Sequence, residues 1–569
     1  MTKRGKKGGS SLARKQKKTQ DMKQILIATL CVLLCQHLPA QDNLSALLPM
    51  PNKVSVPAPD ECFTVCGTTS SIHINSKKLA FAAATLQDVI YRNMQERVEM
   101  AGKGGGQIRL ILDQGLKEAE RYTIDIDGRG MTIRGASEGA VFYGIMTLNQ
   151  ILLGDAFLTS QHKVRNIHID DRPRFGYRAF MLDPARHFLP VASVKFFIDK
   201  MAQYKYNVLQ LHLTDDQGWR LSIDKYPQLA SKEHYTKEDI REIIRYAGER
   251  NVTVVPELDI PGHTAAILAA FPQFKCAGKD SIRIEVGKTE NVMLCASAEG
   301  VYNVIDDIIE EIAGLFTSDY IHLGGDEAAI AGNWAKCPRC LKMMEELGYS
   351  KPSQLMIPFF SRVMDSVKKN GKRTILWCEL DNIHQPVTGY LFPYPKETVL
   401  VSWRAGLTPS CQEYTRNSGN RLIMAPGEYA YLDYPQYKGD LPEFNNWGMP
   451  ITTLETCYRF DPKYGQERDT HIMGIMATLW GEAIKDINRA TYMAYPRGLA
   501  LAEAGWTDMD KRDWMSFKAR MYPNIMNLMK QGVSVRVPFE IEQNLNDYED
   551  TGQSAQGNRN KTPRNKANY

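Results

Sequence analysis

The feature that most constrains the fold is a regular alternation of short apolar runs and longer amphipathic segments between residues 171 and 540. After the first run, Val194, Phe197, Ile198, Met201 and Ala202 recur at the spacing of one helix face. Runs with the length and composition of buried strands cover 177–182, 208–213, 252–256, 320–323, 374–377, 399–402, 421–424 and 474–478. Eight such strands with helical or long connections predict an α/β fold, a (β/α)8 TIM barrel with insertions.

Before the barrel, residues 61–165 alternate strand and helix signals and predict a small α+β domain. Short β-like runs cover 108–112, 122–126 and 131–134, and Ser137 is the expected N-cap of a helix that runs to residue 152. Residues 41–60 are rich in Pro, Ala and Ser and are interpreted as a linker. The polar segment 544–569 has the composition of a disordered tail.

The positive charge of the chain is concentrated at its N-terminus. The formal net charge of +5 is typical of proteins that bind acidic partners, including nucleic acids. Residues 1–23, however, hold nine of the 70 basic residues and one of the 65 acidic residues, so the rest of the chain is slightly acidic. This distribution argues against nucleic-acid binding.

An apolar run over residues 25–35 follows the basic segment and is too short to span a bilayer as a helix. Leu38-Pro39-Ala40 then supplies a small-residue exit, so residues 1–40 are predicted to be a secretory signal peptide with a basic N-terminal extension before Met22. We therefore expect an exported protein, periplasmic or secreted, with no transmembrane span. Lipoprotein anchoring at Cys35 is disfavoured because the bulky Leu34 precedes it.

The cysteines give no clear metal signature. Cys276 and Cys295 flank a loop-like stretch and are a candidate disulfide, which export would permit. Cys337 and Cys340 form a single CxxC motif with no second pair at zinc-binding spacing, so a local disulfide or two free thiols is expected. No metal and no cofactor are predicted.

Polar and aromatic side chains follow every predicted strand, at the end where barrel enzymes place their active sites. In chain order they are Asp183, Arg186 and His187; Asp215 and Asp216; Glu257, Asp259 and His263; Asp326 and Glu327; Trp377 and Glu379; Trp403; Tyr431 and Asp433; and Trp480 and Glu482. Three of the eight Trp residues of the chain fall at these ends. Carboxylates bind sugar hydroxyls and aromatic rings stack on sugar faces, so the pattern favours a carbohydrate site.

At this point the chain resembles the glycoside hydrolase family 20 β-N-acetylhexosaminidases over about residues 60–540. The resemblance rests on six motifs in the family's order: Leu182-Asp183-Pro184-Ala185-Arg186-His187-Phe188, His212-Leu213-Thr214-Asp215-Asp216-Gln217-Gly218-Trp219-Arg220, Pro256-Glu257-Leu258-Asp259-Ile260-Pro261-Gly262-His263, His322-Leu323-Gly324-Gly325-Asp326-Glu327, Ala430-Tyr431-Leu432-Asp433 and Leu479-Trp480-Gly481-Glu482.

The resemblance implies exo-acting, retaining removal of terminal β-linked N-acetylhexosamine from glycans, with the substrate's own 2-acetamido oxygen as nucleophile and an oxazolinium intermediate. Glu327 would be the general acid and then the base. Asp326 would accept the acetamido N–H and stabilise the developing charge, and Tyr431 would donate a hydrogen bond to the acetamido oxygen.

The same resemblance implies roles for the remaining candidates. Trp377, Trp403 and Trp480 would enclose the acetamido methyl group and the sugar face, whereas Arg178, Asp433 and Glu482 would bind sugar hydroxyls. Asp215 would pair with and position Arg178. His263 would join this substrate-binding set and would lie with Asp259 near Glu327.

Two other functions for the barrel stay open on sequence grounds. One is a related glycosidase that releases a disaccharide from a glycan end, and the other is a non-catalytic carbohydrate-binding barrel. The Asp326-Glu327 pair argues against the second, because a binding protein needs no acid beside an amide acceptor. The sequence does not decide between gluco and galacto configuration, the glycosidic linkage or the oligomeric state.

Overall fold

The computed structural model describes residues 45–538 except 59, 103–104, 277–281, 283, 285–289, 380–392, 438–439 and 441–448. The predicted signal peptide over 1–40 and the predicted tail over 544–569 lie outside the described residues. In the described part, no helix has the length and apolar character needed to cross a bilayer.

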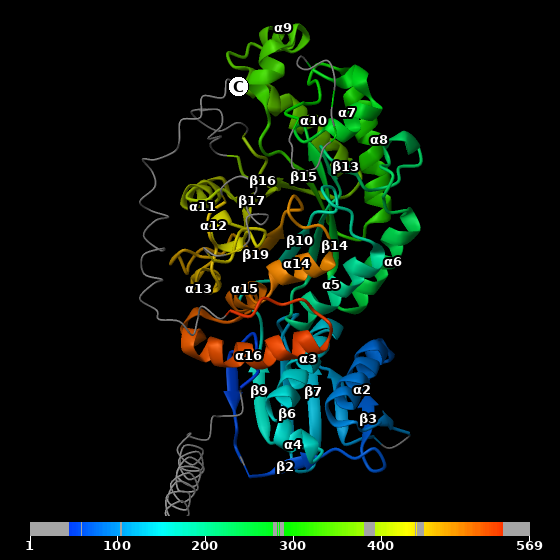
Figure 1. Ribbon diagram of the computed structural model, residues 1–569, viewed down its shortest axis with the longest axis vertical. Coiled ribbons are helices and arrows are strands. Elements are labelled where there is room, and N and C mark those ends of the chain that lie inside the picture. Colours follow the sequence, from blue (N-terminus) through cyan, green and yellow to red (C-terminus); the bar gives the residue numbers. More distant parts are fainter. Residues whose placement is uncertain are drawn as a thin grey trace, which may run out of the picture. The chain divides into compact units, whose positions relative to one another are not determined.

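A closed barrel of eight parallel strands forms the larger part of the chain, as predicted (Figure 1). Its strands are β10 (Tyr177–Leu182), β11 (Val208–His212), β14 (Thr253–Ile260), β15 (Tyr320–Gly324), β16 (Arg373–Trp377), β17 (Val399–Ser402), β18 (Arg421–Met424) and β19 (Ile472–Leu479). β19 closes the ring by pairing with β10, with Tyr177 opposite Gly474. A Cβ at Gly474 would lie 1.8 Å from the Tyr177 carbonyl oxygen, so this closure requires glycine.

Helices and short insertions connect the strands, and three α-helices follow the last strand, β19, in the described part of the chain. The longer ones are α5 (Val191–Gln203), α6 (Lys237–Glu249), α8 (Glu299–Leu315), α10 (Met356–Lys369), α11 (Thr408–Ser418) and α16 (Trp514–Lys530). The shorter ones are α7 (Ala265–Ala270), α9 (Pro338–Glu346), α12 (Gly427–Ala430), α13 (Leu454–Arg459), α14 (Ile487–Ala494) and α15 (Arg497–Trp506). All five apolar residues predicted to share a face of α5 are buried, which confirms the helical interpretation.

The N-terminal domain is built on a seven-stranded mixed sheet. The sheet order is β1 (Lys53–Ser55), β9 (Ile167–Asp171), β6 (Tyr122–Asp127), β7 (Gly130–Gly135), β5 (Ile108–Leu112), β3 (Ser71–Ile74) and β4 (Glu99–Met100). A second, two-stranded sheet pairs β2 (Cys62–Thr64) with β8 (Lys163–Arg165), and the helices are α2 (Ala80–Met94), α3 (Glu138–Gly154) and α4 (Ala156–Ser160). Helix α3 begins at the predicted cap, where Ser137 Oγ accepts the Ala140 N–H at 3.1 Å.

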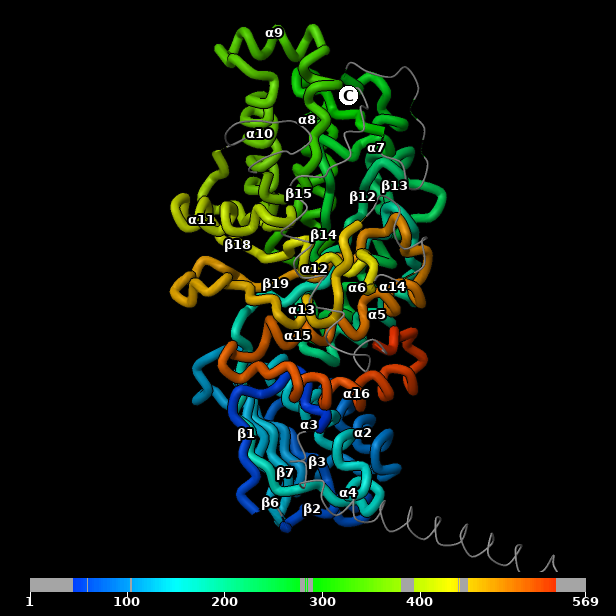
Figure 2. Tube along the Cα trace, turned by 60° about the vertical axis from the view of Figure 1, so that its left-hand side comes forward, coloured from blue at the N-terminus to red at the C-terminus, as the bar shows by residue number. Residues whose placement is uncertain are grey.

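The prediction of a linker over 41–60 is wrong for much of that segment. Residues Ala46, Leu47 and Leu48 are buried, and residues 53–55 form strand β1 at the sheet edge. Helix α16 holds the segment, because Arg520 and Asn524 donate side-chain hydrogen bonds to the carbonyls of Leu47 and Ala46 at 2.7 and 2.9 Å. Figure 2 shows α16 beside the N-terminal domain. The segment therefore joins the two domains as packed structure.

Candidate active site

The Asp326-Glu327 pair lies on a tight turn directly after β15. The turn uses positive φ at Gly324 (64°), Gly325 (95°) and Glu327 (47°), and the last is an uncommon conformation for a residue with a side chain. A Cβ at Gly324 would lie 1.8 Å from Asp259 Oδ1, so glycine is required for Asp259 to lie beneath the turn. The Gly325 N–H is 3.4 Å from that same oxygen.

The two acids differ in their surroundings. The Asp326 side chain is 9% exposed, whereas that of Glu327 is 38% exposed. Burial raises the pKa of Asp326 to about 6, and although His263 opposes this shift, the neighbouring Glu327 charge adds to it. Asp326 Oδ1 is buried without a hydrogen-bond partner among the described residues. Asp326 thus offers a buried acceptor, while Glu327 remains accessible to solvent.

His263 links the acid pair to the rest of the network, as the sequence predicted for its position. Its Nε2 lies 3.8 Å from Asp326 Oδ2 and 3.7 Å from Glu327 Oε2, and its Nδ1 lies 3.3 Å from Asp215 Oδ1. Burial lowers the pKa of His263, but the carboxylates of Asp215 and Asp259 outweigh it and raise that pKa well above its usual value. A protonated His263 places positive charge beside both acids.

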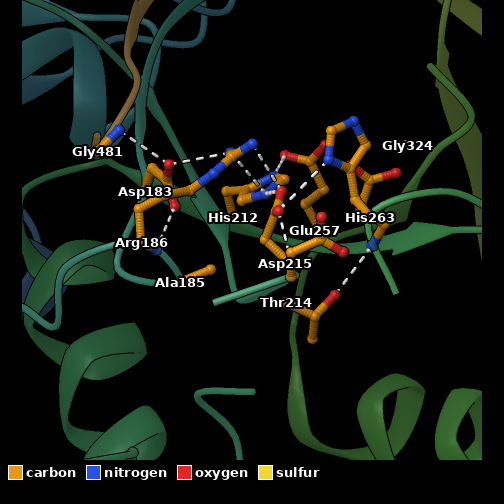
Figure 3. A network of polar contacts seen from close by, with 12 residues as sticks. Asp183, Ala185, Arg186, His212, Thr214, Asp215, Glu257, His263, Gly324 and Gly481 are labelled. Atoms are coloured by element: carbon orange, nitrogen blue, oxygen red, sulfur yellow. Dashed lines mark hydrogen bonds and ion pairs between the residues drawn. The ribbon is translucent and has the colours of Figure 1, made fainter. Parts of the chain in front are cut away.

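Arg186 occupies the centre of the network in Figure 3. Its guanidinium nitrogens lie 3.0 Å from Asp183 Oδ2, 2.9 Å from Asp215 Oδ2 and 4.0 Å from Glu482 Oε1. Burial lowers the pKa of Arg186, but Asp215 and Asp183 raise it well above its usual value. Asp183 also accepts the Gly481 N–H at 2.8 Å, which joins the ends of β10 and β19.

The predicted pairing of Asp215 with Arg178, and the predicted contact of Arg178 with the sugar, are wrong. Arg178 is the second residue of β10 and lies at its amino end, away from the strand ends that carry the acids. Its guanidinium pairs with Glu120 of the N-terminal domain at 2.7 Å and donates to the carbonyls of Lys205 and Phe175. Arg186, which follows the same strand, is the arginine that Asp215 contacts.

Four aromatic side chains form a second group in the site, and Arg186 lies over one of them, Trp480, at 5.0 Å. Trp403 and Tyr431 are stacked, with ring centroids 6.5 Å apart and planes 8° apart. Trp377 lies 6.4 Å from Trp403 and 5.7 Å from Trp480, and Tyr431 lies 6.2 Å from Trp480. The structure brings all four predicted aromatic residues together. Tyr431 Oη and Trp403 Nε1 are buried polar atoms without a hydrogen-bond partner among the described residues.

Glu257 orients the Trp377 side chain through a hydrogen bond. Its Oε1 accepts the Trp377 indole N–H at 2.8 Å, and its Oε2 lies 2.9 Å from His212 Nδ1. Burial raises the pKa of Glu257, but His212 and His322 outweigh it and lower that pKa to about 2. Glu257 is therefore an ionised, fully buried carboxylate that orients a tryptophan. The sequence singled it out at a strand end but gave no signal of this role.

Glu482 lies 4.0 Å from an Arg186 guanidinium nitrogen, and Asp433 lies beside Trp480. Asp433 Oδ1 is 3.4 Å from the Trp480 backbone N–H. Burial raises the pKa of Asp433 well above its usual value, and the Glu482 charge adds to the shift. Burial also raises the pKa of Glu482, against the opposing effect of Arg186. Two acceptors and a cation therefore lie close together beside Trp480, an arrangement that suits the hydroxyls of a sugar.

A further acid and its arginine partner were not assigned from the sequence. Glu379 follows β16, is 2% exposed, and has its Oε2 3.3 Å from an Arg404 guanidinium nitrogen. Burial raises its pKa to about 8; Arg404 opposes the shift and the charge of Asp326 adds to it. The Arg404 guanidinium also lies over Trp403 at 4.1 Å. The only sequence signal was the position of Glu379 after a strand.

Two groups of acid and histidine side chains in this network have metal-like spacing, namely His212 with Glu257 and Asp259, and Asp215 with Asp259 and His263. Each histidine in them already lies within 3.3 Å of a carboxylate, so both groups are explained by ion pairing.

The candidate disulfide between Cys276 and Cys295 is not formed in the structure, where both cysteines are unlinked. They lie in one group with Cys337 and Cys340 of the CxxC motif, which the sequence alone does not connect with them. Cys276 and Cys295 thus provide in space a second pair beside the CxxC motif, although their sequence spacing is not that of a zinc site.

The glycosyl hydrolase family 20 catalytic domain matches residues 175–509, and domain 2 of the same family matches residues 44–172. A β-hexosaminidase of Akkermansia muciniphila is 35% identical over 457 residues, which cover 76% of this chain and 89% of that protein.

Solved structures of family 20 enzymes are similar to this chain in fold. An exo-β-N-acetylglucosaminidase of Vibrio harveyi in complex with N-acetylglucosamine superposes with a TM-score of 0.75 at 29% identity, covering 88% of this chain and 80% of that one. The N-acetyl-β-hexosaminidase of Streptomyces plicatus in complex with thio-NAglucal gives a TM-score of 0.72 at 30% identity, with 88% and 98% covered.

Proposed function

The chain belongs to glycosyl hydrolase family 20, and from this premise we propose that it is an exo-acting β-N-acetylhexosaminidase in which Asp326, Glu327 and Tyr431 carry the reaction. It removes terminal β-linked N-acetylhexosamine with retention of configuration. One observation carries this assignment. A single turn holds a buried Asp326 oxygen, which has no hydrogen-bond partner in the described part of the chain, next to a solvent-accessible Glu327.

The first step forms a bond between the substrate's acetamido oxygen and its anomeric carbon. As the glycosidic bond breaks, Glu327 gives its proton to the leaving oxygen. The Asp326 carboxylate accepts the acetamido N–H and stabilises the positive charge that develops on the resulting oxazolinium ring. Tyr431 donates its hydroxyl proton to a hydrogen bond with the acetamido oxygen and holds that oxygen beneath the anomeric carbon.

In the second step, the Glu327 carboxylate removes a proton from water as that water attacks the anomeric carbon. The ring opens, the acetamido group is restored, and the product keeps the β configuration. No enzyme nucleophile forms a covalent bond, which explains why the two acids can sit on adjacent residues instead of facing each other across the sugar.

Substrate binding divides between the aromatic group and the charged group of the site. Trp377, Trp403 and Trp480 enclose the acetamido methyl group and the sugar face, and Glu257 keeps Trp377 in place. Arg186 replaces Arg178 as the proposed ligand of the sugar hydroxyls, together with Asp433 and Glu482. These three groups offer contacts to either C4 epimer, so both the gluco and the galacto substrate are included in the test.

The test uses 4-nitrophenyl N-acetyl-β-glucosaminide and the corresponding galactosaminide. We expect 4-nitrophenol release, β-configured product at first by NMR, and inhibition by a thiazoline analogue of the intermediate. Glu327→Gln should lower kcat by about 10²- to 10⁴-fold without lowering Tm. Unchanged activity in Glu327→Gln would refute the assignment of the general acid.

The same experiment decides between the other functions. No turnover of any N-acetylhexosaminide, with retained binding of the free sugar, would favour a carbohydrate-binding barrel. Release of a disaccharide from an aryl disaccharide substrate, with no cleavage of the aryl monosaccharides, would favour the disaccharide-releasing activity.

We also propose that the protein is exported, to the periplasm or beyond. Support comes from the sequence alone, in the basic segment, the apolar run over 25–35 and the small-residue exit at Ala40. N-terminal sequencing of protein from the native host should find a start at Gln41. An intact basic segment on the mature protein would contradict export through this signal.

A further inference from the structure

Four cysteines from three segments of the chain converge at one point beside the barrel. Cys276 follows a short helical turn, Cys295 precedes α8, and Cys337 and Cys340 lie at the start of α9. All four are buried, with exposed fractions between 0 and 7%. Every Sγ atom lies within 4.8 Å of the other three.

The spacing of the sulfur atoms matches a tetrahedral metal site better than a pair of disulfides. Cys340 Sγ lies 3.6 Å from both Cys276 Sγ and Cys295 Sγ, and Cys295 Sγ lies 4.0 Å from Cys337 Sγ. Four sulfurs around one zinc ion at about 2.3 Å are about 3.8 Å apart. Disulfides would need two contacts of about 2.05 Å, whereas Cys340 is equally close to two partners.

We propose that Cys276, Cys295, Cys337 and Cys340 bind one Zn²⁺ ion in a closed, structural site. Binding forms four Zn–S bonds and releases the four thiol protons to solvent, with no change in oxidation state. Because all four ligands are protein side chains, no position remains for water or substrate, so the ion has no part in the hydrolysis.

A helix N-terminus and polar side chains lie against the sulfurs and suit the negative charge of a zinc–thiolate centre. Cys337 is the N-cap of α9 and Cys340 lies in its first turn, where the helix dipole stabilises negative charge. The Ser297 hydroxyl lies 3.2 Å from Cys295 Sγ. The Arg339 guanidinium lies near enough to Cys295 and Cys337 to interact with both electrostatically. These groups offset part of the net −2 charge of a Zn²⁺ ion with four thiolates.

The position of the site shows what it would stabilise. Leu294, next to Cys295, donates its N–H to the Pro261 carbonyl in the loop that carries His263, at 3.1 Å. The Trp334 indole N–H donates to the Leu294 carbonyl at 2.9 Å, from the segment between Glu327 and Cys337. The four cysteines therefore connect the loop after β14 to the loop after β15, and both loops carry catalytic-site side chains.

The experiment measures metal content in full-length protein expressed with added zinc. We expect about one zinc ion per chain in the wild type. Cys340→Ser should reduce zinc to background and lower Tm, while Cys411→Ser, at a cysteine that is also buried but lies outside the group, should retain both. Retention of zinc in Cys340→Ser, or iron in place of zinc in the wild type, would overturn the proposal.

A second measurement keeps the proposal testable if Cys340→Ser does not fold. In the wild type, an organomercurial reagent should release zinc to a colorimetric chelator in step with the reaction of four thiols. Removal of the reagent by excess thiol, followed by added Zn²⁺, should restore Tm. Non-reducing peptide mapping that finds disulfides among the four cysteines in zinc-free protein would instead establish disulfides and overturn the metal site.

Discussion

The two ends of the barrel both bury charge, but they satisfy it differently. At the amino end, every nitrogen of the Arg178 guanidinium has an acceptor, and Lys205 Nζ lies 2.9 Å from Tyr122 Oη and 3.5 Å from Asp171 Oδ2. At the carboxyl end, Asp326 Oδ1 and Tyr431 Oη are buried without partners among the described residues.

This difference separates structural charge from functional charge. A buried polar atom without a partner is costly, so it persists mainly where a ligand supplies the missing contact. Arg178 and Lys205 at the amino end join the barrel to the N-terminal domain, and their charges are satisfied by those contacts. In the proposed mechanism, the acetamido group of the substrate supplies the missing contacts of Asp326 and Tyr431 at the carboxyl end. Substitutions at the amino end should therefore lower stability, whereas substitutions at the carboxyl end should lower activity.

The largest effect is expected for Asp326→Asn. The amide keeps the shape of the side chain but cannot provide the negative charge that stabilises the oxazolinium ring, so kcat/KM should fall by about 10³-fold. The Tm should not fall, because the substitution removes a buried carboxylate that lacks a full set of hydrogen-bond partners among the described residues. Kinetics and thermal unfolding at pH 7 measure both. A lower Tm with unchanged kcat/KM would show that Asp326 stabilises the fold and does not act on the substrate.

A matched pair of arginine variants tests the comparison directly. Arg178→Met should lower the free energy of unfolding by about 3 kcal/mol and leave kcat and KM near wild type. Its partner Glu120 is 21% exposed and would remain partly hydrated. The expected loss is therefore at the lower end of the roughly 3–5 kcal/mol that breaking a buried ion pair costs. Arg186→Met should raise KM by about 10²-fold, because charged hydrogen bonds to sugar hydroxyls are lost.

Arg186→Met should also destabilise the fold, since Asp183 and Asp215 then lose a buried cation. The diagnostic readout is therefore KM and not Tm. An Arg178→Met variant with raised KM, or an Arg186→Met variant with normal KM, would reverse the assignment of the two ends.

Tyr431→Phe should lower kcat by about 10²-fold with little change in KM, because its hydroxyl acts on an oxygen whose charge changes during the reaction. The ring remains, so the stack on Trp403 is kept. Tyr434→Phe, at the adjacent ring 5.3 Å away, is the matched control and should retain kcat. Equal losses in the two variants would indicate a general packing effect.

The smallest effect concerns pH. Burial raises the pKa of Asp326 to about 6, and the carboxylate must be ionised to accept the acetamido N–H. For wild type, kcat/KM should fall about tenfold per pH unit below 6. The Asp326→Asn variant should lack this limb of the profile. An acid limb that is identical in both would assign it to another group.

The same shift affects stability with a definite sign. Because the pKa is higher in the folded chain, the contribution of Asp326 is fully present below the unfolded pKa of about 4 and is lost as pH rises through about 6. The Tm advantage of Asp326→Asn over wild type should therefore grow between pH 4 and pH 7.

Local patterns were enough to predict the barrel and most of the site. The strands are short apolar runs, and the rule that barrel sites follow strands placed Asp326, Glu327, Trp377, Tyr431 and Trp480 together. The same rule excludes Arg178, which lies at the amino end of β10, and selects Arg186, whose role the family resemblance had given to Arg178.

Long-range contacts account for what sequence could not show. Leu47 lies in a Pro-rich segment with the composition of a linker. It is held by Arg520, 473 residues later, which donates a hydrogen bond to its carbonyl. Cys276 and Cys340 are 64 residues apart, so their proximity has no local signature. The role of Glu257 depends on Trp377, 120 residues away, and appears only when the barrel closes.

The central claim is that the carboxyl end of the barrel is completed by the acetamido group, which acts as the nucleophile. The most direct measurement compares kcat/KM for aryl β-glucosaminides whose N-acetyl group carries zero, one, two or three fluorine atoms. Fluorine withdraws electrons from the carbonyl oxygen, so the account predicts a steep fall along the series and no cleavage of the 2-hydroxy glucoside. A rate that does not depend on fluorination would contradict it.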